Sequence, residues 1–239
     1  MKAMILAAGR GERMRPLTET TPKPLLKVSG KMLIEYHLEN LVRAGVSQVV
    51  INHAWLGEQL PVALGNGQRY GVDIVYSDEG STALETAGGI IKALPLLCDD
   101  GDDGLDERAP FLVVNGDIWT DYDFRQLVNV SEKFSSQMHL VLVDNPVHHS
   151  EGDFVLDDDG MIQNIDVDQT NQNAPLTFSG IGVYSPEIFT KLNAGVQPLA
   201  PLIRRAITEQ QVSGEHYQGQ WWDIGTPARL QELDTLLQD

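Results

Sequence analysis

A short apolar run at residues 3–6 is followed almost at once by two glycines, Gly9 and Gly11. The run is only a few residues long and ends in small residues, which is typical of a buried β-strand. Glycines one residue apart let the backbone bend tightly and turn consecutive N–H groups toward an anion. The start of the chain therefore predicts a buried first strand with an anion-binding turn at its carboxyl end.

Basic side chains crowd around this turn, although the chain as a whole is acidic. Arg10, Arg13, Arg15 and Lys23 fall close together in a sequence whose formal net charge is -17. A polyphosphate needs amide donors for its oxygens and fixed positive charge for its negative load. The glycine turn and its basic neighbours offer both.

Two common phosphate-binding patterns are incomplete or absent. Met14 stands where the dinucleotide fingerprint G-x-G-x-x-G needs its third glycine. The pattern G-x-x-x-x-G-K-[ST] does not occur, which argues against a P-loop NTPase. For G-x-G alone, a plain glycine turn with a solvated basic edge is the simpler interpretation.

Strand-like and helix-like segments alternate through the first half of the chain. The pattern predicts strands at residues 48–51, 74–76 and 111–114, and helices at 33–42, 56–64 and 86–94, the last stopped by Pro95. Strands separated by helices in this way imply parallel pairing in an open α/β sheet. Ligands on such sheets lie beyond the carboxyl ends of the strands.

The second half changes character. Strand-like segments lie at residues 137–143, 154–156, 161–167 and 176–184, with a strong hairpin turn at 157–160, and helix-like segments lie at 187–192, 202–211 and 226–237. We expect this half to extend the sheet with antiparallel strands and to form one wall of a cleft, as part of the same domain.

Composition narrows the class of partner and compartment. The 34 acidic residues against 17 basic ones repel nucleic acid and anionic membranes. Cys98 is the single cysteine, so no intrachain disulfide can form and a reducing compartment is expected. The apolar N-terminal run is too short for a signal peptide or a membrane span. We expect a cytoplasmic protein.

An acidic run at residues 98–107 interrupts the pattern before the fourth strand. It lacks the D-x-[DN]-x-[DN]-G spacing and terminal Glu of a calcium loop. We interpret it as a solvated surface loop.

The stretch from Leu6 to Thr18, with Lys23 and Pro24, resembles the signature of the sugar-1-phosphate nucleotidylyltransferases. The likeness covers nearly the whole chain. It implies a Rossmann-like α/β fold whose mixed, mostly parallel central sheet is flanked by helices, with a small antiparallel extension. It also implies one domain over residues 1–239, with a nucleotide-binding half to about residue 120 and a sugar-phosphate-binding half from about residue 121.

Two aspartates follow glycine-rich or aromatic segments far apart in the sequence, Asp117 after Asn115-Gly116 and Asp223 after Trp221-Trp222. Each taken alone could be a turn or helix-cap residue. Both segments also resemble the family's two metal-binding aspartates, which implies Mg²⁺ as the cofactor. Two hard oxygen ligands suit Mg²⁺, which completes its shell with water and substrate phosphates.

The resemblance also implies which residues contact the substrates, UTP and a sugar 1-phosphate. Arg13 and Lys23 are the implied catalytic residues, Arg13 at the β- and γ-phosphates and Lys23 at the α-phosphate. The implied nucleotide contacts are Ala7, Ala8, Gly9, Gly11, Arg13, Lys23, Asn52, Thr86 and Gly88. The implied sugar-phosphate contacts are Asn115, Asp153 and Gly180.

Some of these residues have plainer interpretations. Lys23, between two prolines, could be a solvated surface charge; Thr86 is a plausible helix N-cap and Gly88 a packing glycine.

The sequence departs from the family pattern at the sugar site. Many relatives carry a Glu-Lys-Pro segment there, whose lysine meets the sugar phosphate, whereas residues 164–170 of this chain contain no lysine. With the segments at 84–90 and 178–182, this departure resembles the branch that transfers a uridylyl group from UTP to N-acetylmuramate α-1-phosphate in cell-wall recycling. Mannose-1-phosphate guanylyltransferase and an inactive regulatory module remain as alternatives. The chain ends about one helix after Asp223, so a monomer is expected.

Overall fold

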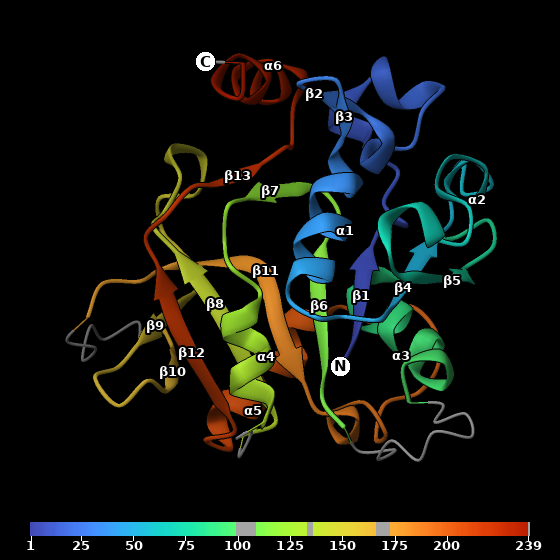
Figure 1. Ribbon diagram of the computed structural model, residues 1–239. Helices are drawn as coiled ribbons and strands as arrows, with labels where there is room; N and C mark the ends of the chain where they lie inside the picture. The colour runs from blue at the N-terminus through green and yellow to red at the C-terminus, as the bar shows by residue number, and fades with distance from the viewer. Residues whose placement is uncertain (99–108, 133–135, 166–172, 239) are drawn as a thin grey trace.

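The computed structural model describes residues 1–98, 109–132, 136–165 and 173–238. Most of the acidic run expected as a surface loop lies outside these residues, as does part of the strand predicted at 161–167. Within them the chain forms a seven-stranded sheet in the order β12-β8-β11-β6-β1-β4-β5 (Figure 1). The strands are β1 (Lys2–Leu6), β4 (Gln48–His53), β5 (Asp73–Asp78), β6 (Phe111–Asn115), β8 (Met138–Val143), β11 (Thr177–Tyr184) and β12 (Val212–Tyr217).

All pairings in this sheet are parallel except the two that β11 makes, with β6 and β8. Because β11 runs opposite to both neighbours, β8 and β12 run in the same direction as β6. The mostly parallel, mixed α/β sheet predicted from the sequence is confirmed. The second half is less antiparallel than we expected, since only one of its three strands in this sheet is reversed.

Helices cover both faces of the sheet, which explains why its strands are apolar on both sides. The helices are α1 (Leu33–Arg43), α2 (Gln59–Leu64), α3 (Glu85–Cys98), α4 (Arg125–Glu132), α5 (Leu199–Thr208) and α6 (Pro227–Leu236). One core cluster joins α1, α2 and α4 to side chains such as Ile5 and Ile51. A second cluster, on the opposite face, joins α3 and α5 to Met4 and Val50.

Three small antiparallel ribbons lie beside the main sheet. They pair β2 (Lys27–Val28) with β3 (Lys31–Met32), β7 (Ile118–Thr120) with β13 (Trp221–Asp223), and β9 (Phe154–Leu156) with β10 (Ile162–Asn164). The β9–β10 hairpin confirms the turn predicted at residues 157–160, where the Gly160 N–H donates to the Asp157 carbonyl. The β7–β13 ribbon joins the two halves of the chain beyond the carboxyl end of β6 (Figure 1).

Short 3₁₀ segments complete the described part of the chain. They are η1 (Glu12–Met14), η2 (Leu17–Glu19), η3 (Lys23–Leu25), η4 (Gln68–Tyr70), η6 (Val147–His149) and η7 (Pro186–Ile188). Segment η7 replaces the helix predicted at 187–192, which was wrong. No described helix is long and apolar enough to cross a membrane.

Several predicted helix limits were wrong for backbone reasons. Helix α3 continues past Pro95 to Cys98 instead of stopping there. Helix α2 begins only at Gln59, because Leu56 has a left-handed φ of 53°. Helix α5 ends at Thr208, and Gln210, with a φ of 54°, turns the chain into β12. Helix α4 and strands β7, β12 and β13 were not predicted.

A buried histidine of α1 supports the turn that carries Asp117. The Nε2 atom of His37 lies 2.9 Å from the carbonyl of Ile118, and its Nδ1 has no hydrogen-bond partner in the described structure. Burial lowers the pKa of His37 to about 4, because a charged imidazole would lose its hydration. The ring is therefore neutral, and Nε2–H donates to the Ile118 carbonyl.

This histidine should make the folded state sensitive to acid. Between pH 6.5 and about 4 the unfolded chain takes up a proton that native His37 refuses, so stability falls as pH falls through that window. The lowered pKa of His37 changes the free energy of unfolding by roughly 3 kcal/mol across this window. His37→Gln, which keeps a donor for Ile118, should flatten this part of the curve of unfolding free energy against pH, measured by urea denaturation. Equal slopes in the two proteins would contradict a neutral buried His37.

Candidate active site

Two adjoining cavities open at the carboxyl ends of β1 and β6. The larger, of about 470 Å³, is lined by the chain after β1, by Lys23 and by the turn after β6. The smaller, of about 290 Å³, lies toward β4 and the start of α3. Leu6, Gly9 and Thr86 line both, so the two form one cleft. A cleft of this size holds a ligand of several functional groups.

The glycine turn forms the floor of this cleft. Gly11 has a left-handed φ of +62°, and a Cβ there would lie 2.9 Å from Cγ2 of Thr18. The Thr18 hydroxyl donates to the Gly11 carbonyl at 2.8 Å and fixes the turn. Gly9, Gly11 and Arg13 line the larger cavity, whereas Ala8 lines the smaller one. The anion-binding turn predicted from the sequence thus faces an open space.

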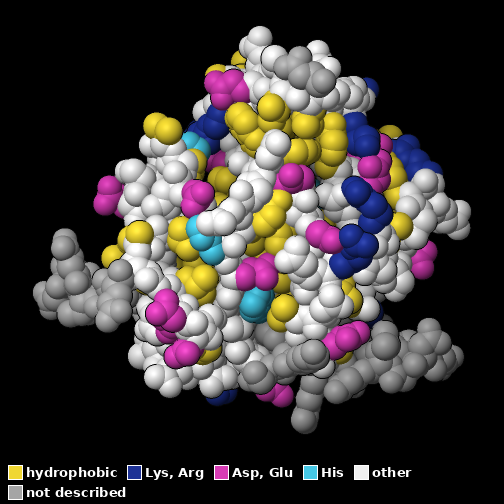
Figure 2. Space-filling view, turned by 60° about the vertical axis from the view of Figure 1, so that its left-hand side comes forward, with side chains coloured by type: hydrophobic (Ala, Val, Ile, Leu, Met, Phe, Trp, Pro, Cys, Tyr) yellow, Lys and Arg dark blue, Asp and Glu magenta, His cyan; other side chains and the backbone are white. Residues whose placement is uncertain are grey.

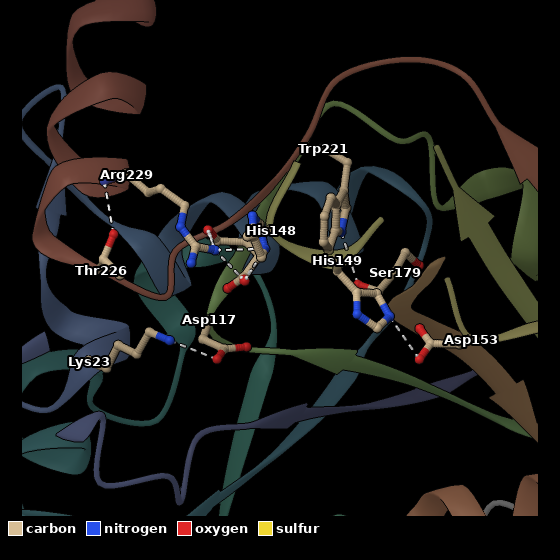
Figure 3. A network of polar contacts seen from close by, with 10 residues as sticks. Lys23, Asp117, His148, His149, Asp153, Ser179, Trp221, Thr226 and Arg229 are labelled. Atoms are coloured by element: carbon tan, nitrogen blue, oxygen red, sulfur yellow. Dashed lines mark hydrogen bonds and ion pairs between the residues drawn. The ribbon is translucent and has the colours of Figure 1, made fainter. Parts of the chain in front are cut away.

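Lys23 is buried and paired rather than a solvated surface charge. Its side chain is 8% exposed, and its Nζ lies 2.7 Å from Oδ2 of Asp117 (Figure 3). Lys23 comes from η3 and Asp117 from the turn after β6, so the contact spans the cleft. The contact holds the Lys23 ammonium group and the Asp117 carboxylate together where the two loops meet.

Asp117 and Asp223 lie on neighbouring backbone segments. Asp223 pairs in register with Ile118 in the β7–β13 ribbon, and the Ile224 N–H donates to the Asp117 carbonyl at 3.0 Å. The Oδ2 atom of Asp223 contacts Nη1 of Arg229 at 2.5 Å and Nε2 of His148 at 3.1 Å (Figure 3). Each carboxylate therefore already has a cationic partner, Lys23 for one and Arg229 for the other.

This donor set fits a magnesium ion. The two carboxylates, on neighbouring backbone segments, are hard oxygen ligands, and the described residues contain no cluster of three or more His, Cys, Asp or Glu side chains that would enclose a metal. Mg²⁺ prefers such partial sites, because it keeps water and substrate phosphates in its shell. Asp117 and Asp223 would hold it.

The smaller cavity is shaped by a buried polar chain. The Asn52 Oδ1 accepts from the Ala7 N–H at 2.8 Å, and its Nδ2 donates to Oε1 of Glu79 at 2.6 Å. The other oxygen of Glu79 accepts from the Leu84 N–H at 2.7 Å. Asn52 therefore ties the loop after β1 to the segment before α3, in addition to lining the cavity. The role of Glu79 as an anchor was not predicted from the sequence.

Thr86 and Gly88, both in α3, have different surroundings. Thr86 lines both cavities, as its predicted nucleotide contact requires. Gly88 lines neither: a Cβ there would lie 2.2 Å from the Gly195 carbonyl, and the Gly88 N–H donates to the carbonyl of Gln197. Its surroundings are those of a packing glycine, the plainer interpretation of the sequence.

The three residues expected at the sugar phosphate differ in their position relative to the cleft. Asn115 lines the larger cavity, and its side chain lies against Gly180, whose φ is +81°. Asp153 lines neither cavity, and its carboxylate accepts from the Phe178 N–H at 2.9 Å and contacts Nε2 of His149 at 3.1 Å (Figure 3). Asp153 thus links the segment just before β9 to strand β11.

Sequence reasoning missed His148 and Arg229. Neither belongs to a motif of its own, although Arg229 stands six residues after Asp223 in the segment already singled out. Figure 2 shows one face of the molecule, on which acidic and histidine side chains are scattered and several basic side chains gather on the right-hand side.

Comparison with known proteins agrees with this geometry. The family model for nucleotidyl transferases matches residues 2–239. The chain is 51% identical to N-acetylmuramate alpha-1-phosphate uridylyltransferase of Neisseria meningitidis serogroup B, over 99% of this chain and 98% of the relative. It is 34% identical to the protein of the same name from Caulobacter vibrioides, over 94% of this chain and 92% of the relative.

A solved structure shares the fold. A Bacillus anthracis protein described provisionally as a glucose-1-phosphate thymidylyltransferase superposes with a TM-score of 0.82 at 21% identity, over 100% of this chain and 96% of the other. Because the family model matches residues 2–239, this chain belongs to the nucleotidyl transferase family.

Proposed function

We propose that this protein transfers a uridylyl group from UTP to N-acetylmuramate α-1-phosphate, giving UDP-N-acetylmuramate and pyrophosphate. The observation that carries the proposal is the 51% identity to the Neisseria meningitidis enzyme of that name along almost the full length of both chains. The cleft supports it with a buried lysine, an open glycine turn and Asp117, which is hydrogen-bonded through its backbone to the segment that carries Asp223. A catalytically inactive nucleotide-binding module would have no need of all these groups.

The reaction joins two anions. A phosphate oxygen of the sugar 1-phosphate attacks the α-phosphorus of UTP in line, the bond to the β-phosphate breaks, and pyrophosphate leaves. The attacking phosphate is already anionic, so no general base is needed. The task of the protein is to hold two mutually repelling groups together and to neutralise the charge that develops.

The residues divide this task by position. The N–H groups of Ala8, Gly9 and Gly11 would hold the nucleotide, and Arg13 would neutralise the β- and γ-phosphates. Lys23 would hold the α-phosphate close to the incoming oxygen. Residues up to about 120 would hold the nucleotide, and those from about 121 the sugar phosphate.

Asp117 and Asp223 would hold a Mg²⁺ ion. When bound there, the ion supplies charge neutralisation for the phosphate oxygens. We further propose that the protein acts as a cytoplasmic monomer in the recycling of cell-wall sugars, with no nucleic acid or membrane partner.

A panel of substrates tests the reaction. A muramate differs from glucosamine by a lactyl ether at C3, which adds bulk and a carboxylate. We expect efficient transfer from UTP to N-acetylmuramate α-1-phosphate and weaker transfer to N-acetylglucosamine 1-phosphate, with UTP preferred over GTP. Pyrophosphate release should be compared as kcat/KM, because only differential transition-state binding defines specificity. A higher value for GTP with mannose 1-phosphate would replace the proposed substrates with those of the guanylyltransferase.

The two aspartates should act as one unit. Asp117→Asn and Asp223→Asn should each lower kcat strongly with little change in melting temperature, because each removes a charged ligand of the same ion. The double variant should be little worse than either single variant, since residues that act together are non-additive. Losses that multiply would count against a shared Mg²⁺.

Lys23 should matter for rate more than for folding. Lys23→Ala removes one preorganised positive charge from the reacting phosphates, and such a loss lowers kcat by about 10²-fold or more. Steady-state kinetics with UTP and N-acetylmuramate α-1-phosphate measures the effect. Turnover close to that of the wild type would rule out a contact with the α-phosphate.

A further inference from the structure

Arg229 is a positively charged residue beside the cleft, and the reaction described so far gives it no role. It lies in α6, its side chain is 19% exposed, and its Nη1 contacts Oδ2 of Asp223 at 2.5 Å and the Asp223 carbonyl at 3.2 Å. Nη1 also lies 2.9 Å from Nε2 of His148, which comes from η6 between β8 and β9. The neighbouring helix α6 and the distant segment η6 thus converge on the carboxylate of Asp223 (Figure 3).

The guanidinium lies next to Gly225 at the edge of the larger cavity, although Arg229 is not itself one of the residues that line it. Gly225 lines that cavity, and a Cβ on Gly225 would lie 3.2 Å from Nη1 and 3.3 Å from Nη2 of Arg229. Asp117, which also lines the cavity, is joined to the same ribbon through the hydrogen bond from the Ile224 N–H. No side chain at position 225 separates Arg229 from the cleft.

The contacts of His148 are not mutually satisfied. Its Nε2 lies within hydrogen-bond distance of both a donor, Nη1 of Arg229, and an acceptor, Oδ2 of Asp223. One nitrogen can accept from the arginine or donate to the aspartate, but not both at once. Whichever tautomer His148 adopts, one of its two Nε2 contacts is left without a hydrogen bond. An additional acceptor for the guanidinium would relieve this conflict.

The charges of the side chains that line the cleft indicate the chemical nature of that acceptor. Among the described residues, the basic side chains that line the two cavities are Arg13 and Lys23, and Lys23 is already paired with Asp117. A nucleoside triphosphate and a sugar phosphate together bring several negative charges into this space. The forked guanidinium matches an oxyanion with two parallel hydrogen bonds.

We propose that Arg229, supported by His148, binds an oxyanion of the sugar 1-phosphate substrate. This inference rests on the proposed function. Arg229 neutralises Asp223 in the structure described here and turns to the substrate's anionic group when Asp223 takes a divalent cation. The anionic group is either the 1-phosphate or the lactyl carboxylate, since both offer two oxygens to the guanidinium.

The test separates sugar binding from nucleotide binding. Arg229→Met keeps the length of the stem and removes the charge, Arg229→Lys keeps the charge without the fork, and Arg125→Met is a matched control. Arg125 pairs with Asp123 at 2.6 Å on the surface and lines a different pocket, away from Gly225 and the Asp223 cluster. KM should be measured for N-acetylmuramate α-1-phosphate at saturating UTP, and for UTP at saturating sugar phosphate, with Mg²⁺ present.

We expect Arg229→Met to raise the KM for the sugar phosphate roughly 10- to 100-fold, the scale of a lost hydrogen bond to a charged group. Arg229→Lys should fall between it and the wild type, and the KM for UTP should change less than about threefold. Arg125→Met should behave as the wild type. An unchanged KM for the sugar phosphate in Arg229→Met would overturn the proposal.

A purely structural Arg229 would give a different pattern. If it only positioned Asp223, Arg229→Met would lower kcat with both KM values unchanged, and calorimetric titration with Mn²⁺ would show weaker binding. Under the proposal Mn²⁺ binds at least as tightly, because a competing cation has gone. Melting temperatures of all variants show whether the fold is kept. If Arg229→Met does not fold, Arg229→Lys and His148→Gln carry the same comparison.

A second sugar identifies the oxyanion. An equal rise in KM for N-acetylmuramate α-1-phosphate and N-acetylglucosamine 1-phosphate assigns Arg229 to the phosphate, and a rise for the muramate alone assigns it to the lactyl carboxylate. Failure of the proposed function is visible separately, in the wild type. If that enzyme prefers another sugar 1-phosphate, the same KM comparison applies to that substrate.

Discussion

The parallel pairing of β1 with β6 is the contact on which the cleft depends. It sets Leu6 opposite Asn115, and the Gly116 N–H continues the pairing by donating to the Leu6 carbonyl at 2.9 Å. Both strands therefore end at the same level, and the glycine turn after one faces the aspartate turn after the other. The Lys23–Asp117 contact and the larger cavity follow from that register. A shift of one residue would separate the groups that must meet.

Much of this could be predicted because the signals are local. The apolar runs of β1, β4 and β6 are buried on both faces, and the glycine turn follows the first of them directly. The functional grouping of Asp117 with Asp223 came from the family resemblance, since nothing in their local sequence brings residues so far apart together. The β7–β13 ribbon that joins them is three residues on each side, too short to show periodicity.

What could not be predicted depends on tertiary contacts. Glu79 becomes an anchor only because Asn52, on β4, and Leu84, before α3, lie within 2.6 and 2.7 Å of its two oxygens. The limits of α2 and α5 depend on left-handed residues, Leu56 and Gln210, that carry no glycine signal. Arg229 and His148 stand out only because they contact Asp223, and the order of residues along the chain does not reveal these contacts.

Each of the two carboxylates is paired with a cation for a physical reason. Asp117 and Asp223 lie on adjacent backbone segments, and like charges on neighbouring, partly buried segments repel each other. Lys23 and Arg229 offset this repulsion by pairing with one carboxylate each. In the proposed reaction a divalent cation would take over that role, and the two basic side chains would become available to the phosphate-bearing substrates.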